Sequence, residues 1–369
     1  MTLRIRTIAA AAAVSALLLS SCAIEDETTP APPADGATTG AAGTEPAAPS
    51  AAEPEDSLVV ACGNQEDVCQ AWVAAFEEKT GVATSYVRLA SGEAVARLES
   101  AKSNPEFDVW HGGPVDGYNV AAAAGLLDTY NSPAASEIDP KYMDPDGYWG
   151  GIYVGVLGFC SNQAVQHGLG VEAPKTWDDL LDPKLKGQIM MAHPATSGTA
   201  FTTLWTQVVL RGGEDQALDW MRQLHGNILQ YTKSGSAPAQ SAGRGEVATS
   251  IVFSHDCVKY EEQGMTDLVT TIPSDGTGWE IGGVALIKGA QHPNAAKLYY
   301  DWALSAEAQE IGPKHQSYQL FTNPNGAPDE RMVNLDEVTL VDYDFKAAAE
   351  AKESLTARFD EEIAAAPKE

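Results

Sequence analysis

A short apolar run, Ile251–Phe253, is followed by four side chains that could each do chemistry: Ser254, His255, Asp256 and Cys257. A run of this kind is typical of a buried strand, so these polar groups are expected to emerge where the strand ends. A hydroxyl, an imidazole, a carboxylate and a thiol in sequence could form a hydrolytic site or a metal site. They could also provide hydrogen-bonding groups for a small molecule.

The hydrolytic and zinc interpretations are both weak. A catalytic triad requires the base to reach the nucleophile and a third group to reach the base. Three consecutive residues, Ser254 to Asp256, cannot easily place their side chains in this chain of contacts. No Gly-x-Ser-x-Gly motif accompanies them. A zinc site is disfavoured because the chain has no Cys-x-x-Cys pair. The sequence therefore favours a binding protein over an enzyme.

The first 22 residues have the pattern of a secretory signal. Arg4 and Arg6 precede an apolar stretch, residues 8–19, that is too short for a permanent membrane-spanning helix. Residues 19–22 read LSSC, which resembles the bacterial lipobox. That resemblance implies that Cys22 becomes the lipid-modified first residue of an extracytoplasmic protein anchored to the cell membrane. An ordinary signal peptide with a coincidental cysteine is the alternative.

Composition divides the remaining chain into a linker and a folded part. Residues 23–56 consist almost wholly of Ala, Pro, Thr, Gly, Ser and acidic residues, a composition that predicts a disordered linker. Residues 57–369 are long for a single core and suggest two lobes. The net charge of −28 makes a nucleic-acid partner improbable.

The cysteine count predicts two disulfides. Five cysteines are present, and four remain if Cys22 carries lipid. An even number in an exported protein implies disulfides, and four cysteines allow three pairings. Cys62 ends a strand pattern and Cys69 opens a helix pattern seven residues later, so we expect a Cys62–Cys69 bond. Elimination then leaves Cys160–Cys257.

Strand and helix patterns alternate along the first half of the folded part. Strands are predicted at 57–62, 82–89 and 107–113, with helices at 68–79 and after Ser91, which is suited to be an N-cap. This order is typical of an α/β lobe with a largely parallel sheet.

Three turns between a strand and a helix share one chemistry. Each offers hydroxyls, a glycine and free N–H groups at a helix start, where the helix dipole favours an anion. A single such turn is more often structural, but ligands of open α/β sheets bind at the carboxyl ends of strands. We therefore predict an anion site there, to which Gly113 could add a backbone contact and Lys233 a charge. The turn residues are Ser91, Gly92, Glu93, Thr196, Ser197, Gly198, Thr199, Ser234, Gly235 and Ser236.

Four segments resemble the solute-binding proteins of bacterial ABC transporters, in the branch often labelled iron(III)-binding. They are ATSGTAFTTLWTQ, QYTKSGSAPAQSAGRGEVA, FSHD and GTGWEIGGVALIKGAQHPNAAKLYYDWALSAEAQE. The resemblance covers about 57–345. It implies a two-lobe periplasmic-binding-protein type II fold with two crossing hinge strands, at 153–160 and 279–287.

The resemblance also implies a domain division and partners. Lobe 1 would comprise 57–155 and 280–369, and lobe 2 would comprise 156–279. A small anionic ligand would bind between the lobes, and the closed receptor would dock on a membrane permease. We expect a monomer that needs no cofactor.

The ligand is indicated by finer features of the resemblance. Iron-binding members carry two adjacent tyrosines where this chain has Ser254-His255-Asp256. The latter motif, followed by Gly-Thr-Gly-Trp-Glu at 276–280, resembles binders of phosphorylated sugars. The resemblance implies that His255, Asp256 and Glu280 hold sugar hydroxyls while the helix starts hold the phosphate.

Two other ligands remain open. One is iron(III), held by His, Asp and Glu side chains with Tyr318. The other is aminoethylphosphonate, whose ammonium would pair with Asp256 and Glu280. Weaker candidates for the cleft are Trp110, Trp279, His193 and Asp116.

Overall fold

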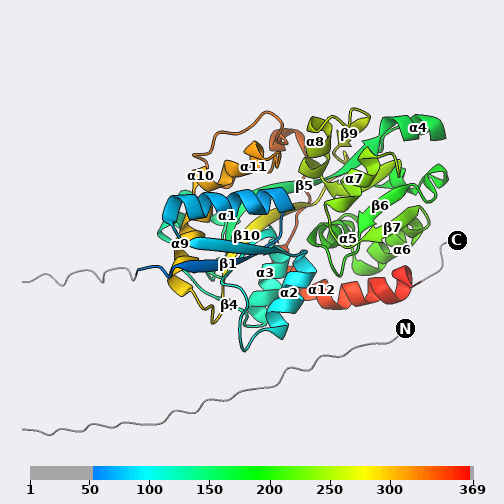
Figure 1. The fold of residues 1–369 in the computed structure, drawn as a ribbon. Coiled ribbons are helices and arrows are strands. Elements are labelled where there is room, and N and C mark those ends of the chain that lie inside the picture. Colours follow the sequence, from blue (N-terminus) through cyan, green and yellow to red (C-terminus); the bar gives the residue numbers. More distant parts are fainter. Residues whose placement is uncertain (1–52, 366–369) are drawn as a thin grey trace, which may run out of the picture. The chain divides into compact units, whose positions relative to one another are not determined.

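A computed structural model describes residues 53–365 of the chain (Figure 1). The predicted signal (1–22), Cys22 and nearly all of the predicted linker lie outside the described residues. Within 53–365, no helix is both long and apolar enough to cross a membrane.

The first lobe is built around a parallel sheet, as the alternating pattern predicts. β1 pairs in parallel with both β2 and β3, and helices follow each of these strands. The elements are β1 (Ser57–Cys62), α1 (Glu66–Thr80), β2 (Ala83–Arg88), α2 (Ser91–Ser100), β3 (Val109–Pro114), α3 (Val115–Ala123) and β4 (Leu127–Asp128).

The second lobe repeats this architecture with its own sheet. β6 pairs in parallel with β7 and β8. The elements are α4 (Gln163–Leu169), β6 (Ile189–Ala192), α5 (Gly198–Arg211), α6 (Glu214–His225), β7 (Ile228–Thr232), α7 (Ala237–Gly243), β8 (Thr249–Phe253), α8 (Ser254–Glu262) and β9 (Leu268–Thr271).

Two long strands connect the lobes, β5 (Gly150–Asn162) and β10 (Trp279–Ile287). The strand order is β2-β1-β3-β10-β5-β8-β6-β7, with β4 beside β10 and β9 beside β5. β5 is antiparallel to β10 up to Val156 and antiparallel to β8 from Leu157 onward. The change of partner within one strand is what joins the two sheets.

The C-terminal region returns to the first lobe and then leaves it. Its helices are α9 (Pro293–Ala303), α10 (Ala306–Gln309), α11 (Ile311–Lys314) and α12 (Phe345–Phe359), followed by a π-helical turn, Asp360–Ala364. Short 3₁₀ turns lie at Pro133–Glu137, Pro140–Tyr142, Asp178–Leu181, Pro183–Leu185 and Leu335–Glu337. The prediction that all of 280–369 belongs to lobe 1 is wrong for the last part, because Tyr343, Leu355 and Phe359 pack in the core of lobe 2.

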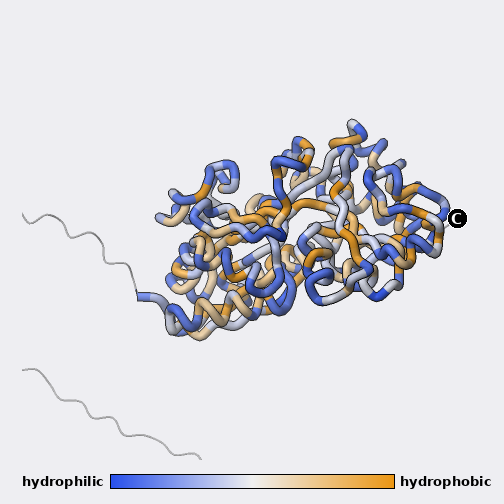
Figure 2. Tube along the Cα trace, turned by 90° about the horizontal axis from the view of Figure 1, so that it is seen from above, coloured by the Kyte–Doolittle hydropathy of each residue, from blue (hydrophilic) through white to orange (hydrophobic). Residues whose placement is uncertain are grey.

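Local sequence explains the elements that shape the cleft. In α1, Val68, Trp72 and Phe76 are buried at helical spacing, and the helix ends at Gly81, whose φ of 76° favours glycine. Hydrophobic segments run through the interior, while hydrophilic segments lie mostly at the periphery (Figure 2). One predicted detail changes. Ala90 is the N-cap of α2, so Ser91 is its first helical residue.

Both disulfides are present. Cys62–Cys69 joins the end of β1 to α1, and Cys160–Cys257 joins β5 to the first turn of α8. Cys257 is thus a structural residue of lobe 2. The stretch SHDC is the first turn of a helix that begins directly after β8.

Candidate functional site

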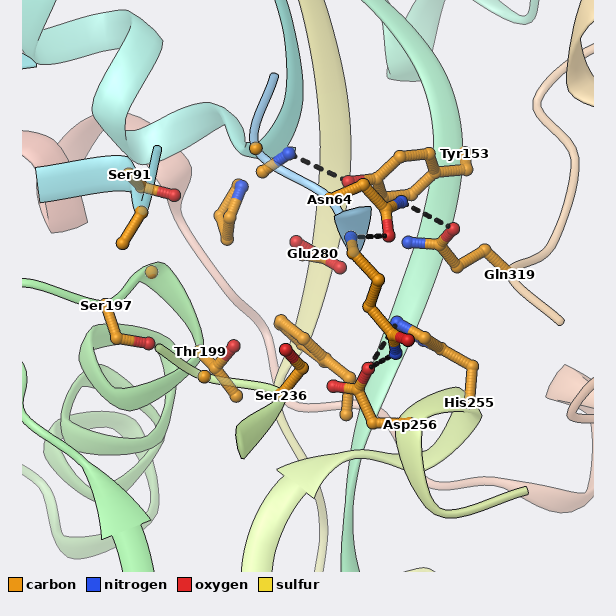
Figure 3. Close-up of a pocket in the computed structure, with 18 of the residues that line it drawn as sticks. Asn64, Ser91, Tyr153, Ser197, Thr199, Ser236, His255, Asp256, Glu280 and Gln319 are labelled. Carbon is orange, nitrogen blue, oxygen red and sulfur yellow. Dashed lines mark hydrogen bonds and ion pairs between the residues drawn. The ribbon is translucent and has the colours of Figure 1, made fainter. Parts of the chain in front are cut away.

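A polar pocket lies between the lobes, with about 440 Å³ of empty space that includes its open mouth (Figure 3). Helix starts and strand ends of both lobes supply its walls. It is lined by Gly63, Asn64, Gln65, Arg88, Ala90, Ser91, Gly113, Pro114, Tyr153, Ser197, Gly198, Thr199, Gly235, Ser236, Phe253, His255, Asp256, Glu280 and Gln319.

One end of the pocket combines the starts of α2 and α5 with the turn before α7. Ser91 faces Ser197 and Thr199 across the pocket, and Ser236 lies beside them (Figure 3). Ser197 is the N-cap of α5 and accepts a hydrogen bond from the backbone N–H of Ala200 at 3.3 Å. Backbone N–H groups and dipoles at helix starts favour an anion. This end of the pocket is suited to a phosphate or a carboxylate.

Arg88, which sequence reasoning missed, brings a full positive charge to this end. Its Nη2 donates to Ser234 Oγ at 2.7 Å, and its Nε donates to the backbone oxygen of Asn64 at 3.0 Å. Among the described residues that line the pocket, Arg88 alone is a lysine or arginine. An arginine at the carboxyl end of a parallel strand was the available signal, since ligands bind at that edge.

Four predicted site residues and Lys233 lie outside the pocket lining. The Gly92 N–H donates to the backbone oxygen of Thr196 at 3.0 Å, which joins the two lobes directly. Lys233 forms an ion pair with Glu93 and so does not supply the pocket charge. Ser234 does not line the pocket, but its hydroxyl contacts two residues that do, Arg88 at 2.7 Å and Ser236 at 3.2 Å. A Cβ on Gly92 would meet the oxygen of Ala195 at 2.2 Å, so glycine there permits close approach of the lobes.

The opposite end of the pocket holds His255, Asp256 and Glu280, which the structure brings together (Figure 3). Their exposed fractions are 6%, 4% and 2%. Gln65, at the start of α1 in lobe 1, donates through Nε2 to Asp256 Oδ1 at 2.5 Å. Asp256 is therefore held across the cleft by the other lobe.

His255 is a neutral group at this end. Burial lowers the pKa of His255 below its usual value, and this outweighs the opposing effect of nearby Asp256. Its Nε2 lies 3.9 Å from Asp256 Oδ1, beyond hydrogen-bond distance. Ser254 is buried and does not line the pocket. A Ser-His-Asp relay is therefore not assembled here.

Glu280 is buried beside other carboxyl groups. Burial raises its pKa well above 4.5, and Asp256 and Asp116 raise it further. A protonated carboxyl can donate as well as accept a hydrogen bond, which suits a ligand hydroxyl in either role.

Glu280→Gln is expected to remove a pH-dependent loss of stability. Between 4.5 and the raised pKa, the folded state keeps a proton that the unfolded state has lost, so stability falls as pH rises. The folding stability of the variant minus that of wild type should therefore be larger at about pH 8 than at about pH 5. Urea unfolding at both pH values measures this. Glu99→Gln, at an exposed position of α2, is the control. The prediction would be contradicted if the stability difference between Glu280→Gln and wild type were the same at both pH values.

Tyr153 and Gln319 complete the wall, and neither was predicted from the sequence. Tyr153 Oη accepts the backbone N–H of Gly113 at 2.8 Å, so the predicted ligand contact of that N–H is already used. Gln319 Oε1 accepts from Asn64 Nδ2 at 3.1 Å and from Ser317 Oγ at 2.7 Å. These bonds join a distant loop to the start of α1.

The weaker sequence candidates lie outside the pocket. Trp110 is buried and stacked on Tyr118, and Trp279 packs edge-on against Phe345. His193 pairs with Asp360 at 2.9 Å. No tryptophan of the described chain lines this pocket. In residues 53–365, no three His, Cys, Asp or Glu side chains cluster so as to hold a metal ion.

Comparison with known proteins identifies the family. Residues 71–334 match the family "bacterial extracellular solute-binding protein". This chain is a bacterial extracellular solute-binding protein. The solute-binding protein is thus the extracytoplasmic receptor of an ABC importer, and its known relatives are binding proteins rather than enzymes.

Solved structures and a sequence relative agree with that family. The periplasmic binding protein AfuA from Actinobacillus pleuropneumoniae, determined with exogenous fructose-6-phosphate bound, is 41% identical. The alignment of the two structures covers 85% of this chain and 100% of AfuA, with a TM-score of 0.82. The periplasmic binding protein P5PA is 34% identical over 84% of this chain and 100% of its own, with a TM-score of 0.80. A Haemophilus influenzae protein is 39% identical over 83% of this chain and 90% of its own.

Proposed function

We propose that the receptor binds a phosphorylated small molecule, most specifically a sugar phosphate. The observation that carries this proposal is the division of one pocket into two chemically opposite ends. Arg88 and the helix starts near Ser91 and Ser197 provide positive charge and N–H donors. His255, Asp256 and Glu280 provide groups that suit hydroxyls.

One solved relative supports the same ligand class. AfuA, at 41% identity over its full length, has a structure with fructose-6-phosphate bound. An iron(III) ligand is less favoured, because the described residues contain no cluster of metal-binding side chains. Aminoethylphosphonate would also place an anion at Arg88. Asp256 and Glu280 would then contact its ammonium group, where a sugar phosphate would offer hydroxyls.

Binding would couple to closure of the lobes. The anion end draws on α2 of lobe 1 and α5 of lobe 2, and the hydroxyl end draws on α8 of lobe 2 and β10. A ligand that contacts both lobes favours the closed arrangement over the open one. The closed form would be the one that docks on the permease.

Isothermal titration with glucose 6-phosphate tests the proposal, with glucose, phosphate, aminoethylphosphonate and ferric citrate as comparators. We expect tight binding of the sugar phosphate and weak binding of glucose or phosphate alone. Asp256→Ala should weaken sugar-phosphate binding at least about tenfold, roughly 1.4 kcal/mol. Asp336→Ala, an exposed aspartate, is the matched control. Preference for aminoethylphosphonate or iron would overturn the proposed ligand class while leaving the receptor assignment intact.

A further inference from the structure

The start of α1 in lobe 1 and the start of α8 in lobe 2 are joined by a second polar contact beside the one between Gln65 and Asp256. Lys259 Nζ donates to Asp67 Oδ2 at 2.6 Å. Lys259 follows Asp256 by three residues, so the two side chains lie on the same face of α8. Gln65 and Asp256 line the ligand pocket, whereas Asp67 and Lys259 do not. The same two helices therefore meet both at the pocket and next to it.

The two members of this ion pair differ strongly in exposure. The side chain of Lys259 is 5% exposed, whereas that of Asp67 is 51% exposed. Among residues 53–365, Asp67 is the only acidic partner of the Lys259 ammonium. Loss of one partner from a buried pair leaves an uncompensated charge, which costs far more than loss of an exposed pair. The buried ammonium thus depends on a carboxylate from the other lobe.

Asp67 is oriented by its own helix. Its Oδ1 accepts the backbone N–H of Val68 at 3.1 Å, which leaves Oδ2 for Lys259. Asp67 also lies in the first turn of α1, where the helix dipole favours a carboxylate. Neither interaction involves lobe 2, so lobe 1 by itself places this carboxylate for the ammonium on α8.

Contacts with lobe 1 flank Lys259 on both sides along α8. On one side lies the start of α1. On the other side, Gln263 Nε2 donates to Gln316 Oε1 at 3.0 Å, and Glu262 pairs with Arg331 at 2.8 Å. Gln316 and Arg331 belong to the segment that follows α11, a helix of lobe 1. The burial of Lys259 therefore depends on contact between the lobes, and its ammonium would regain water if they separated.

We propose that Asp67 is a positioning residue for closure of the receptor, because its carboxylate compensates the ammonium that closure buries on α8. This inference rests on the proposed function, in which closure of the lobes encloses the ligand. With Asp67 present, Lys259 enters the interface paired, and Gln65 reaches Asp256. Without Asp67, the unpaired buried ammonium favours separation of the lobes. The effect does not depend on which ligand the pocket holds.

The test compares Asp67→Ala with Glu66→Ala, which removes the neighbouring carboxylate of the same helical turn. Glu66 accepts a hydrogen bond from Tyr86 Oη at 2.7 Å within lobe 1, so it is not part of the contact between lobes. The readouts are binding of glucose 6-phosphate and the distances between nitroxide labels at two exposed sites, Glu78→Cys on α1 and Glu172→Cys in lobe 2. Asp67→Ala should weaken binding at least tenfold, mainly through faster dissociation, and should lengthen the ligand-free distances. Glu66→Ala should match wild type.

Removal of the buried charge separates this role from a purely structural one. Lys259→Met keeps an apolar side chain of similar length but has no ammonium, so the closed state no longer requires Asp67. The double variant Asp67→Ala/Lys259→Met should therefore recover at least part of the affinity and of the short distances lost in Asp67→Ala. If the double variant is as open as Asp67→Ala, the effect does not act through Lys259 and the proposal is overturned. Wild-type affinity or wild-type ligand-free distances in Asp67→Ala would each overturn it as well.

The label distances separate failure of this inference from failure of the proposed function. If wild type does not bind glucose 6-phosphate, the proposed ligand is wrong, but the ligand-free distances still test Asp67. Longer distances in Asp67→Ala, shortened again in the double variant, would then support the inference. Equal ligand-free distances in wild type and Asp67→Ala would overturn it.

Discussion

Replacing Arg88 with methionine is expected to weaken binding of glucose 6-phosphate at least about a hundredfold, roughly 2.8 kcal/mol of binding free energy. Arg88 is the fixed cation at the anion end, and Ser234 and the backbone oxygen of Asn64 hold its guanidinium in place. Hydrogen bonds between a guanidinium and a phosphate are charge-assisted and stronger than neutral ones. The helix starts remain in the variant, so some phosphate affinity should persist.

Titration of two further variants gives this prediction its controls. Arg97→Met removes a surface arginine that pairs with Glu106 on lobe 1, and it should bind as wild type. Arg88→Lys keeps the charge but loses the planar fork, so it should recover only part of the affinity. If Arg88→Met binds as tightly as wild type, the phosphate group lies elsewhere in the pocket.

Removal of the Cys160–Cys257 disulfide is expected to cost about 4.7 kcal/mol of folding stability, from the loop of 97 residues that it closes. Removal of Cys62–Cys69, which closes a loop of only 7 residues, should cost about 2.4 kcal/mol by the same chain-entropy argument. Both pairs are buried, so the comparison isolates loop length. Urea unfolding of the two Cys→Ala double variants measures the difference.

The Cys160–Cys257 variant should also bind ligand more weakly. Cys257 follows Asp256 directly in the first turn of α8, so loosening that turn displaces a pocket residue. Titration well below the unfolding temperature separates this effect from lost stability. For the stability comparison, a larger loss on removing Cys62–Cys69 than on removing Cys160–Cys257 would contradict the argument from loop length.

Local patterns in the sequence predict much of the fold. The alternating order of strands and helices, both disulfides and the lobe-crossing strands at β5 and β10 are confirmed. Of the predicted ligand residues, those at helix starts and strand ends mostly line the pocket, because their local geometry already carries the signal. Ser197 and His255 are of this kind.

The remainder depends on contacts between distant parts of the chain. Gln319 reaches the pocket from a loop after the last lobe 1 helices, and no local pattern marks it. Gly92 looks like a ligand contact from its turn, but the opposite lobe occupies that space. The placement of α12 on lobe 2 follows from Leu355 and Phe359, whose helical spacing predicts a buried face but does not identify its partner.

The long strand β5 has a consequence for how the protein unfolds. All of its residues are buried, and it forms hydrogen-bonded ladders with β10 on one side of the lobe boundary and with β8 and β9 on the other. Neither sheet can lose this strand without disrupting the other. The two lobes are therefore expected to melt in a single cooperative step, and the amides of β5 should be among the last to exchange with solvent.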